Sequence, residues 1–97
     1  MARIKWTSEA EQWLQDIYLY IARRNRAAAK RVVQGIYKKA QSLKQFPHLG
    51  YKYRTDPQGE VRILLYGHYK IAYLIKSNDQ IDILGVFHSA LDIDRLI

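Results

Sequence analysis

Cysteine is absent from this 97-residue chain, and acidic residues are absent from a long part of it. Without cysteine there can be no disulfide, no thiolate nucleophile and no cysteine-based zinc site, which fits a reducing compartment. No apolar run approaches the roughly 20 residues that cross a bilayer, and the first residues lack the apolar stretch of a signal peptide. We therefore expect a small cytoplasmic protein with no membrane association.

The acid-free part covers residues 17–55 and contains ten Lys or Arg residues. Because the net charge of the chain is +7, this window holds most of the positive charge. A concentrated positive field attracts polyanions or an acidic protein partner. The charge alone does not decide between nucleic acid and protein.

Apolar residues, which make up 48% of the chain, are spaced for helices first and for strands later. Arg3–Trp6 alternates as a short strand does. Apolar positions at i, i+3, i+4 and i+7 then predict two helices, over residues 8–25 and 27–43, that form an α-hairpin. Runs of β-branched and aromatic residues predict strands over residues 61–66, 69–76 and 81–88.

The predicted order of elements is β-α-α-β-β-β, in one α+β domain that spans residues 1–97. A helical hairpin would pack on one face of a small, mainly antiparallel sheet. Residues 89–97 would form a short C-terminal tail, either as a helical turn or as a docked arm. The sequence shows no repeat and no linker between domains.

Three stretches, each made mostly of core and turn residues, occur in a recognisable order. They are Ala10…Trp13-Leu14…Ile17-Tyr18, then Leu43…Phe46-Pro47-x-Leu49-Gly50, then Val61-Arg62…Gly67-x-Tyr69 followed by Val86-x-His88. Together they resemble the RelE/ParE superfamily of bacterial type II toxin–antitoxin systems over essentially the whole chain. The resemblance implies the fold of that superfamily, a toxin activity and a cognate antitoxin partner.

That superfamily joins two activities on one fold, so the fold does not decide the mechanism. RelE-like toxins cleave mRNA in the ribosome without a metal, whereas ParE-like toxins inhibit DNA gyrase and have no accepted catalytic centre. The segment Gly67-x-Tyr69 and the ending that contains Asp92-Ile93 resemble the ParE branch. The resemblance therefore favours a gyrase inhibitor that is not an enzyme, with a ribosome-dependent mRNA endonuclease as the alternative. Operator DNA would be reached only through the antitoxin.

Under the nuclease alternative, the catalytic candidates are Arg62 and His88. If Val61, Ile63 and Leu65 face the helices, Arg62 lies on the exposed face of the sheet, where a fixed cation could stabilise a phosphorane-like transition state. His88 could exchange protons with RNA on the same face. The alternatives are a strand arginine in a salt bridge and a structural histidine.

Lys52, Tyr53 and Arg54 alternate cation, aromatic and cation, which suits a nucleic-acid backbone with a base stacked on Tyr53. The same pattern suits a solvated loop whose tyrosine lies on the core. No histidine pair has the spacing of a metal site, so we expect no metal and no cofactor.

Four cations of the helical hairpin are candidates for antitoxin binding, because antitoxin tails of this superfamily are commonly acidic and complementary charge speeds association. They are Arg23, Arg24, Arg31 and Lys38. The alternative is a solvated face whose side chains cover apolar neighbours. In the tail, Asp92 and Arg95 are candidates for contact with the target.

Overall fold

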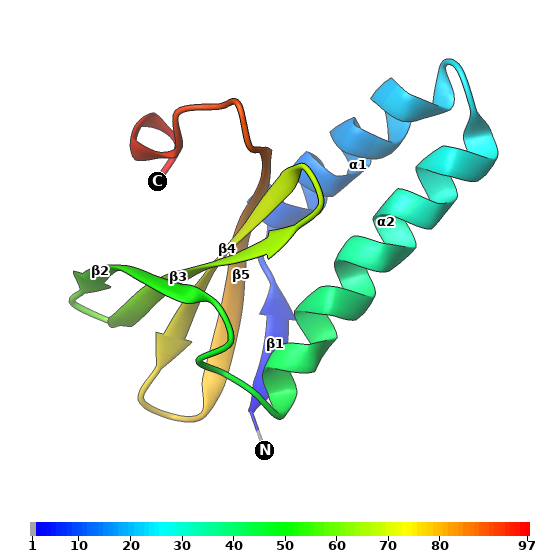
Figure 1. Ribbon diagram of the computed structural model, residues 1–97. Helices are drawn as coiled ribbons and strands as arrows, with labels where there is room; N and C mark the ends of the chain where they lie inside the picture. The colour runs from blue at the N-terminus through cyan, green and yellow to red at the C-terminus, as the bar shows by residue number, and fades with distance from the viewer. Residues whose placement is uncertain (1) are drawn as a thin grey trace.

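The computed structural model describes residues 2–97 and contains two α-helices and a five-stranded sheet (Figure 1). The sheet order is β1-β5-β4-β3-β2, in which β1 pairs parallel with β5 and every other pair is antiparallel. The elements are β1 (Arg3–Trp6), α1 (Ser8–Ala22), α2 (Arg26–Gln41), the 3-10 turn η1 (Ser42–Lys44), β2 (Tyr51–Asp56), β3 (Gly59–Tyr66), β4 (Tyr69–Lys76), β5 (Gln80–His88) and the 3-10 turn η2 (Ile93–Arg95).

Both helices begin at side-chain caps that their sequences supply. The Thr7 hydroxyl accepts a hydrogen bond from the amide of Ala10 at 3.1 Å and donates one to the carbonyl of Ile83 at 2.8 Å, which ties the start of α1 to β5. Asn25 accepts from the amide of Ala28 at 2.9 Å and starts α2. Each such cap contributes about 1 kcal/mol to its helix. The break between the helices is therefore short and well defined.

The helical hairpin lies on one side of the sheet, and the C-terminal tail lies on the other (Figure 1). On the helix side, Ile36, Ala40 and Leu43 of the α2 segment pack with Ile71 and Ile83 of the central strands, all fully buried. The apolar stripe predicted for the second helix is confirmed. This larger core orients the hairpin against the sheet.

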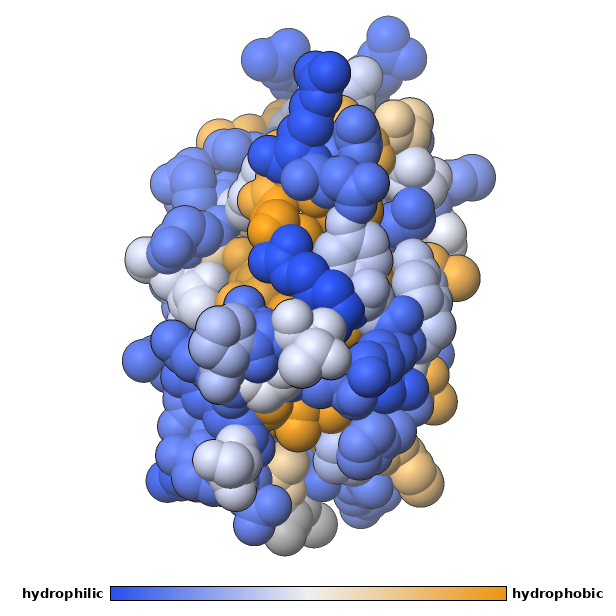
Figure 2. All heavy atoms as spheres, turned by 90° about the vertical axis from the view of Figure 1, so that its left-hand side faces the viewer, coloured by the Kyte–Doolittle hydropathy of each residue, from blue (hydrophilic) through white to orange (hydrophobic). Residues whose placement is uncertain are grey.

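A second, smaller core lies beneath the tail. Ile93 is 8% exposed and packs with Ile63, Ala72 and Phe87. The tail is thus a docked arm that ends in a short 3-10 turn. Seen from the side of the tail and β2, the surface is largely hydrophilic, with hydrophobic atoms showing near the middle and in patches along the edges of the view (Figure 2).

The predicted α+β class, with a helical hairpin on a mainly antiparallel sheet, is confirmed. One strand was not predicted from the sequence, because residues 51–56 form the edge strand β2 and not a loop. The predicted facing of β3 was also wrong. Leu64 faces the helices, Ile63 packs under the tail, and Leu65 is 56% exposed.

Candidate functional site

Arg62 lies on the helix-facing side of the sheet, not on the exposed face. In β3 it pairs directly with Tyr73 of β4, and directly opposed residues share a face. Tyr73 is fully buried and belongs to the core under the helices. The conditional placement of Arg62 on the outer face was therefore wrong, because β3 has the opposite facing.

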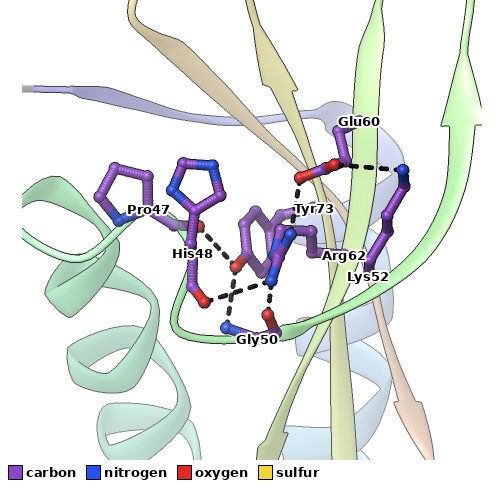
Figure 3. Close-up of polar contacts among 7 residues, drawn as sticks. All are labelled: Pro47, His48, Gly50, Lys52, Glu60, Arg62 and Tyr73. Carbon is purple, nitrogen blue, oxygen red and sulfur yellow. Dashed lines mark hydrogen bonds and ion pairs between the residues drawn. The ribbon is translucent and has the colours of Figure 1, made fainter.

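The guanidinium of Arg62 makes three short-range contacts with the chain (Figure 3). Its Nε donates to the carbonyl of Gly50 at 2.7 Å, one terminal nitrogen contacts Glu60 at 2.6 Å, and the other reaches the carbonyl of His48 at 3.4 Å. The side chain is only 16% exposed. These donors hold the segment that leads from the helices into β2, and they leave the guanidinium little freedom to meet a phosphate.

The Tyr73 hydroxyl adds two hydrogen bonds to the same segment (Figure 3). It donates to the carbonyl of Pro47 at 2.7 Å and accepts from the amide of Gly50 at 3.0 Å. Burial raises the pKa of the Tyr73 phenol, although the hydrogen bond from Gly50 and the charge of Arg62 act in the opposite direction. A Cβ on Gly50 would lie 2.5 Å from the carbonyl oxygen of Ile63, so this close approach requires glycine.

Glu60 is the acidic member of the same group, which we call the Arg62 cluster: His48, Gly50, Glu60, Arg62 and Tyr73. The hydrogen bond from Arg62 is the main cause that lowers the pKa of Glu60; burial opposes it, and the charges of Arg62 and Lys52 add to the lowering. Glu60 was not among the functional residues predicted from the sequence. An acid two residues before an arginine on one strand shares its face, and this was the available signal.

His88 lies at the other end of the sheet and is exposed. The amide of Ala90 donates to its Nδ1 at 3.1 Å, so the neutral ring carries its proton on Nε2. The ring stacks on His68 at 6.2 Å between centroids and meets Tyr69 edge-on at 5.7 Å. Within residues 2–97, this histidine forms no hydrogen bond or ion pair with an acid or with Arg62.

The two nuclease candidates do not come together. Arg62 pairs with Tyr73 in β4, whereas His88 pairs with Tyr69 of the same strand. The offset of four residues between Tyr69 and Tyr73 alone corresponds to about 13 Å along β4. In addition, Arg62 and His88 lie in β3 and β5, the two strands that flank β4. A general acid or base must reach the reacting atoms within hydrogen-bond distance. One bound phosphodiester therefore cannot be in contact with both side chains in this arrangement.

The residues predicted to bind nucleic acid, Lys52, Tyr53 and Arg54, do not all lie on one face of β2. Lys52 forms an ion pair with Glu60 at 3.6 Å and so extends the Arg62 cluster. Tyr53, at the bulge between Lys52 and Arg54, packs against the small core beneath the tail. The guanidinium of Arg54 lies 5.8 Å from the centroid of the Tyr53 ring.

The two helices of the hairpin carry opposite charge. α1 contains three acidic residues and no Lys or Arg, whereas α2 contains five Lys or Arg residues and no acid. Arg23 caps the C-terminus of α1, and Arg24 lies in the turn. The positive surface therefore belongs to α2 and the turn, and not to the whole hairpin. The positive charge that the sequence assigned to residues 17–55 is therefore absent from α1 and concentrated on α2 and the turn.

The four predicted antitoxin contacts are spread along the hairpin. Arg23, Arg24, Arg31 and Lys38 are exposed, and none is in a salt bridge within residues 2–97. From Arg31 to Lys38 the helix rises by about 10 Å, and Arg23 and Arg24 lie before its first residue. The spacing suits a partner that lies along α2 and not one that makes a single-point contact.

A groove of about 750 Å³ runs along one flank of α2, and we call it the lysine groove. Its rim carries Lys38, Lys39 and Lys44, and its wall includes Phe46 and Leu49. These two apolar residues are 59% and 49% exposed. Exposed apolar side chains beside unpaired lysines are typical of a surface that a protein partner covers.

A second groove, of about 710 Å³, separates the hairpin from β1. Ile4, Trp6, Leu14, Val33 and Tyr37 contribute its apolar lining. Trp6 stacks on Tyr37 with 5.9 Å between ring centroids. The indole nitrogen of Trp6 is buried and has no hydrogen-bond acceptor among the described residues.

The tail places its predicted residues at the surface. Asp92 accepts from the amide of Asp94 at 3.1 Å, and its carboxylate lies 3.7 Å from the guanidinium of Arg95. Both side chains are more than half exposed, whereas the intervening Ile93 is buried. The tail thus exposes Asp92 and Arg95 to solvent, while Ile93 packs it against the sheet.

Within residues 2–97, no group of three or more His, Cys, Asp or Glu side chains is arranged to hold a metal ion. In the same part of the chain, no helix is both long and apolar enough to cross a membrane. These observations concern only the side chains and helices that the structure describes.

The comparison with known proteins agrees with the fold. A family model described as the ParE toxin of the type II toxin–antitoxin system parDE matches residues 4–93. A chain of the chromosomal ParDE system from P. aeruginosa superposes with a TM-score of 0.73 at 26% identity, covering 91% of this chain and 96% of that one. A chain of the RelBE2 toxin–antitoxin complex from Mycobacterium tuberculosis has a TM-score of 0.68 at 20% identity, covering 90% and 96%, and shows the shared fold alone. No curated protein sequence matches.

A helical hairpin on a mixed five-stranded sheet defines a small α+β domain of the type found in toxin–antitoxin complexes. Because the family model covers nearly the whole sequence, this chain belongs to the ParE toxin family of type II toxin–antitoxin systems. The predicted membership of the RelE/ParE superfamily is confirmed.

Proposed function

We propose that this toxin inhibits growth by acting on DNA gyrase in the cytoplasm, without cleaving RNA, and that a cognate antitoxin neutralises it. The observation that carries the proposal is the state of Arg62. Its guanidinium is bound to Gly50 and Glu60 and lies far from His88, so the two candidates for RNA chemistry do not form one site. The 26% identical ParDE chain supports the same choice.

Two assays distinguish gyrase inhibition from mRNA cleavage. Purified toxin is added to a gyrase supercoiling reaction and, separately, to a translation reaction that is read by primer extension. We expect loss of supercoiling and no new primer-extension stops. Ribosome-dependent cleavage of mRNA would overturn the proposal and favour the endonuclease alternative.

His88→Ala is the most informative variant for this choice, with His68→Ala as its matched control. Both histidines are exposed, and their rings stack on each other. For a gyrase inhibitor that does no proton transfer, the two variants should be equally toxic in cells. Loss of toxicity in His88→Ala alone, together with loss of RNA cleavage, would assign His88 a catalytic role.

For the antitoxin, we propose a docking surface along α2 that includes Arg23, Arg24, Arg31 and Lys38. The exposed cations are unpaired within residues 2–97, and the lysine groove supplies apolar contact beside them. Complementary charge mainly accelerates encounter and makes it sensitive to salt. Operator DNA would then be bound by the antitoxin.

Charge reversal tests this surface. Arg31→Glu should lower the association rate with the cognate antitoxin several-fold at low salt, and it should weaken the salt dependence. Arg54→Glu is the matched control because it changes the net charge equally on an exposed residue of β2. Equal slowing by both variants would indicate a general charge effect and would contradict docking along α2.

We also propose that the tail contacts gyrase through Asp92 and Arg95. Removing residues 92–97 would also remove the buried Ile93, so point variants are the better test. The double variant Asp92→Asn, Arg95→Gln should weaken inhibition of supercoiling while the thermal stability is retained. Asp94→Asn serves as a control from the same turn, and inhibition that is unchanged in the double variant would exclude this contact.

A further inference from the structure

A hollow of about 510 Å³ lies where α1 meets the ends of β4 and β5, away from the Arg62 cluster and the lysine groove. We call it the aromatic hollow. Four of its lining residues have ring systems, and they come from three different elements: Trp13 and Tyr20 from α1, Tyr69 from β4 and His88 from β5. Ile17, Val86 and Leu91 add apolar contact, and Asp16 is the remaining lining residue.

The rings are held in place by contacts within the chain. Trp13 meets Phe87 edge-on at 4.7 Å between centroids, and His88 meets Tyr69 edge-on at 5.7 Å. His88 is also held by the amide of Ala90. Burial raises the pKa of the Tyr69 phenol, and the nearby Tyr20 is the second cause. Several π faces therefore surround one space that exists before any ligand arrives.

Asp16 is the charged residue of this hollow. Its carboxylate accepts a hydrogen bond from the side-chain amide of Gln12 at 2.9 Å. Within residues 2–97 it forms no salt bridge, although the chain has sixteen Lys or Arg residues. An exposed carboxylate without a cation in so basic a protein is free to pair with a cation from outside.

The hollow also differs from four other concave surfaces of the molecule. Both grooves described above, the hollow at Arg23 and Arg24, and the one beside Lys76 each include at least one Lys or Arg in their lining. The aromatic hollow includes none. It therefore combines π faces and a carboxylate in a place from which the chain's own cations are absent.

We propose that the aromatic hollow binds the guanidinium of an arginine side chain presented by a protein partner. A cation over the face of Trp or Tyr is attracted by the ring quadrupole, and a planar guanidinium both stacks on rings and pairs with a carboxylate. The carboxylate of Asp16 opposes a nucleic-acid occupant. This second surface would thus recognise positive charge, whereas α2 recognises negative charge.

The test uses three small probes and the isotope-labelled toxin, with binding followed by NMR. N-acetyl-arginine methylamide should shift the resonances of Asp16, Tyr20, Tyr69 and His88 with millimolar affinity. The citrulline analogue has nearly the same shape without the charge, and it should bind about fivefold more weakly, since a partly exposed cation–π contact contributes about that factor. The lysine analogue should fall between them because its ammonium does not stack.

Two variants test whether the arginine probe binds in the aromatic hollow. Asp16→Asn should weaken binding of the arginine probe, whereas Glu9→Gln, which changes another exposed acid of α1, should leave it unchanged. Tyr20→Leu retains apolar area without the π face and should also weaken binding. Equal affinities for the arginine and citrulline probes, insensitivity to both Asp16→Asn and Tyr20→Leu, or shifts confined to other acidic residues would each overturn the proposal. Unfolding temperatures verify that the variants are folded.

Discussion

Two positions along β4 carry polar side chains in very different states. In the middle of the strand, Tyr73 and its neighbour Arg62 direct their donors and acceptors to backbone groups of residues 47–50 and to Glu60. At the start of the strand, Tyr69 and its neighbour His88 line an open hollow beside the carboxylate of Asp16, which forms no salt bridge within residues 2–97. Polar groups that are satisfied internally stabilise the fold, whereas groups left facing solvent remain available to a partner.

The difference shows that residue type alone does not define the role of a side chain in this fold. An arginine on a central strand has the chemistry that RNA cleavage requires, and here its hydrogen bonds hold the segment that joins the helices to β2. Replacing residues at the two positions should therefore have unequal consequences for stability. The following variants test that inequality, beginning with the largest effect.

Arg62→Ala should give the largest loss of stability, about 2–4 kcal/mol, because it leaves the carboxylate of Glu60 and the carbonyl of Gly50 without their donor. Chemical denaturation measures the difference. Arg54→Ala is the control, since this arginine is exposed and forms no salt bridge among the described residues; it should change stability by less than about 0.5 kcal/mol. Similar losses in the two variants would show that the Arg62 cluster has no special structural role.

Tyr73→Phe should destabilise the protein by about 1–2 kcal/mol, because it leaves the carbonyl of Pro47 and the amide of Gly50 unpaired near the core. Tyr69→Phe is the matched variant from the start of the same strand, where the hydroxyl forms no hydrogen bond with the described residues. We expect a change of less than about 0.5 kcal/mol for Tyr69→Phe. A larger effect at Tyr69 than at Tyr73 would reverse the comparison.

Glu60→Gln should make a difference that depends on pH. The pKa of Glu60 is lowered in the folded chain from an ordinary value of 4.5, so its charge stabilises the fold above that value. This contribution is lost as the pH falls through the lower, folded-state pKa. Denaturation of wild type and variant between pH 7 and pH 3 should show a gap that narrows below pH 4.5. A gap that is constant over this range would mean that the Glu60 charge does not stabilise the cluster.

The elements with strong periodicity could be predicted from the sequence, and the residues that depend on tertiary pairing could not. The stripe through Ile36, Ala40 and Leu43 defines one helix face, and it was confirmed. By contrast, β2 is mostly exposed and has a sheet neighbour on one side only, so its residues lack the apolar pattern of a core strand. Its pairing with β3 is what makes it a strand.

Which face of β3 packs against the helices could not be predicted for a related reason. Apolar residues occupy both faces of this strand, since the helices cover Leu64 and the tail region covers Ile63. A shift of one residue exchanges the two faces of a strand. Because apolar residues lie on both faces of β3, the sequence pattern could not decide which face carries Arg62. The aromatic hollow was missed because Asp16, Tyr69 and His88 lie far apart in the sequence and converge only in the fold.

His88→Ala should have the smallest effect on stability, less than about 0.5 kcal/mol, because the ring is exposed and its one hydrogen bond is to a backbone amide two residues away. Its two ring neighbours, the stacked His68 and the edge-on Tyr69, keep their own backbone positions without it. The same denaturation experiment that ranks Arg62→Ala first should rank this variant last. A loss of 2 kcal/mol or more would make His88 a structural histidine, and the two positions along β4 would then be alike in holding the fold together.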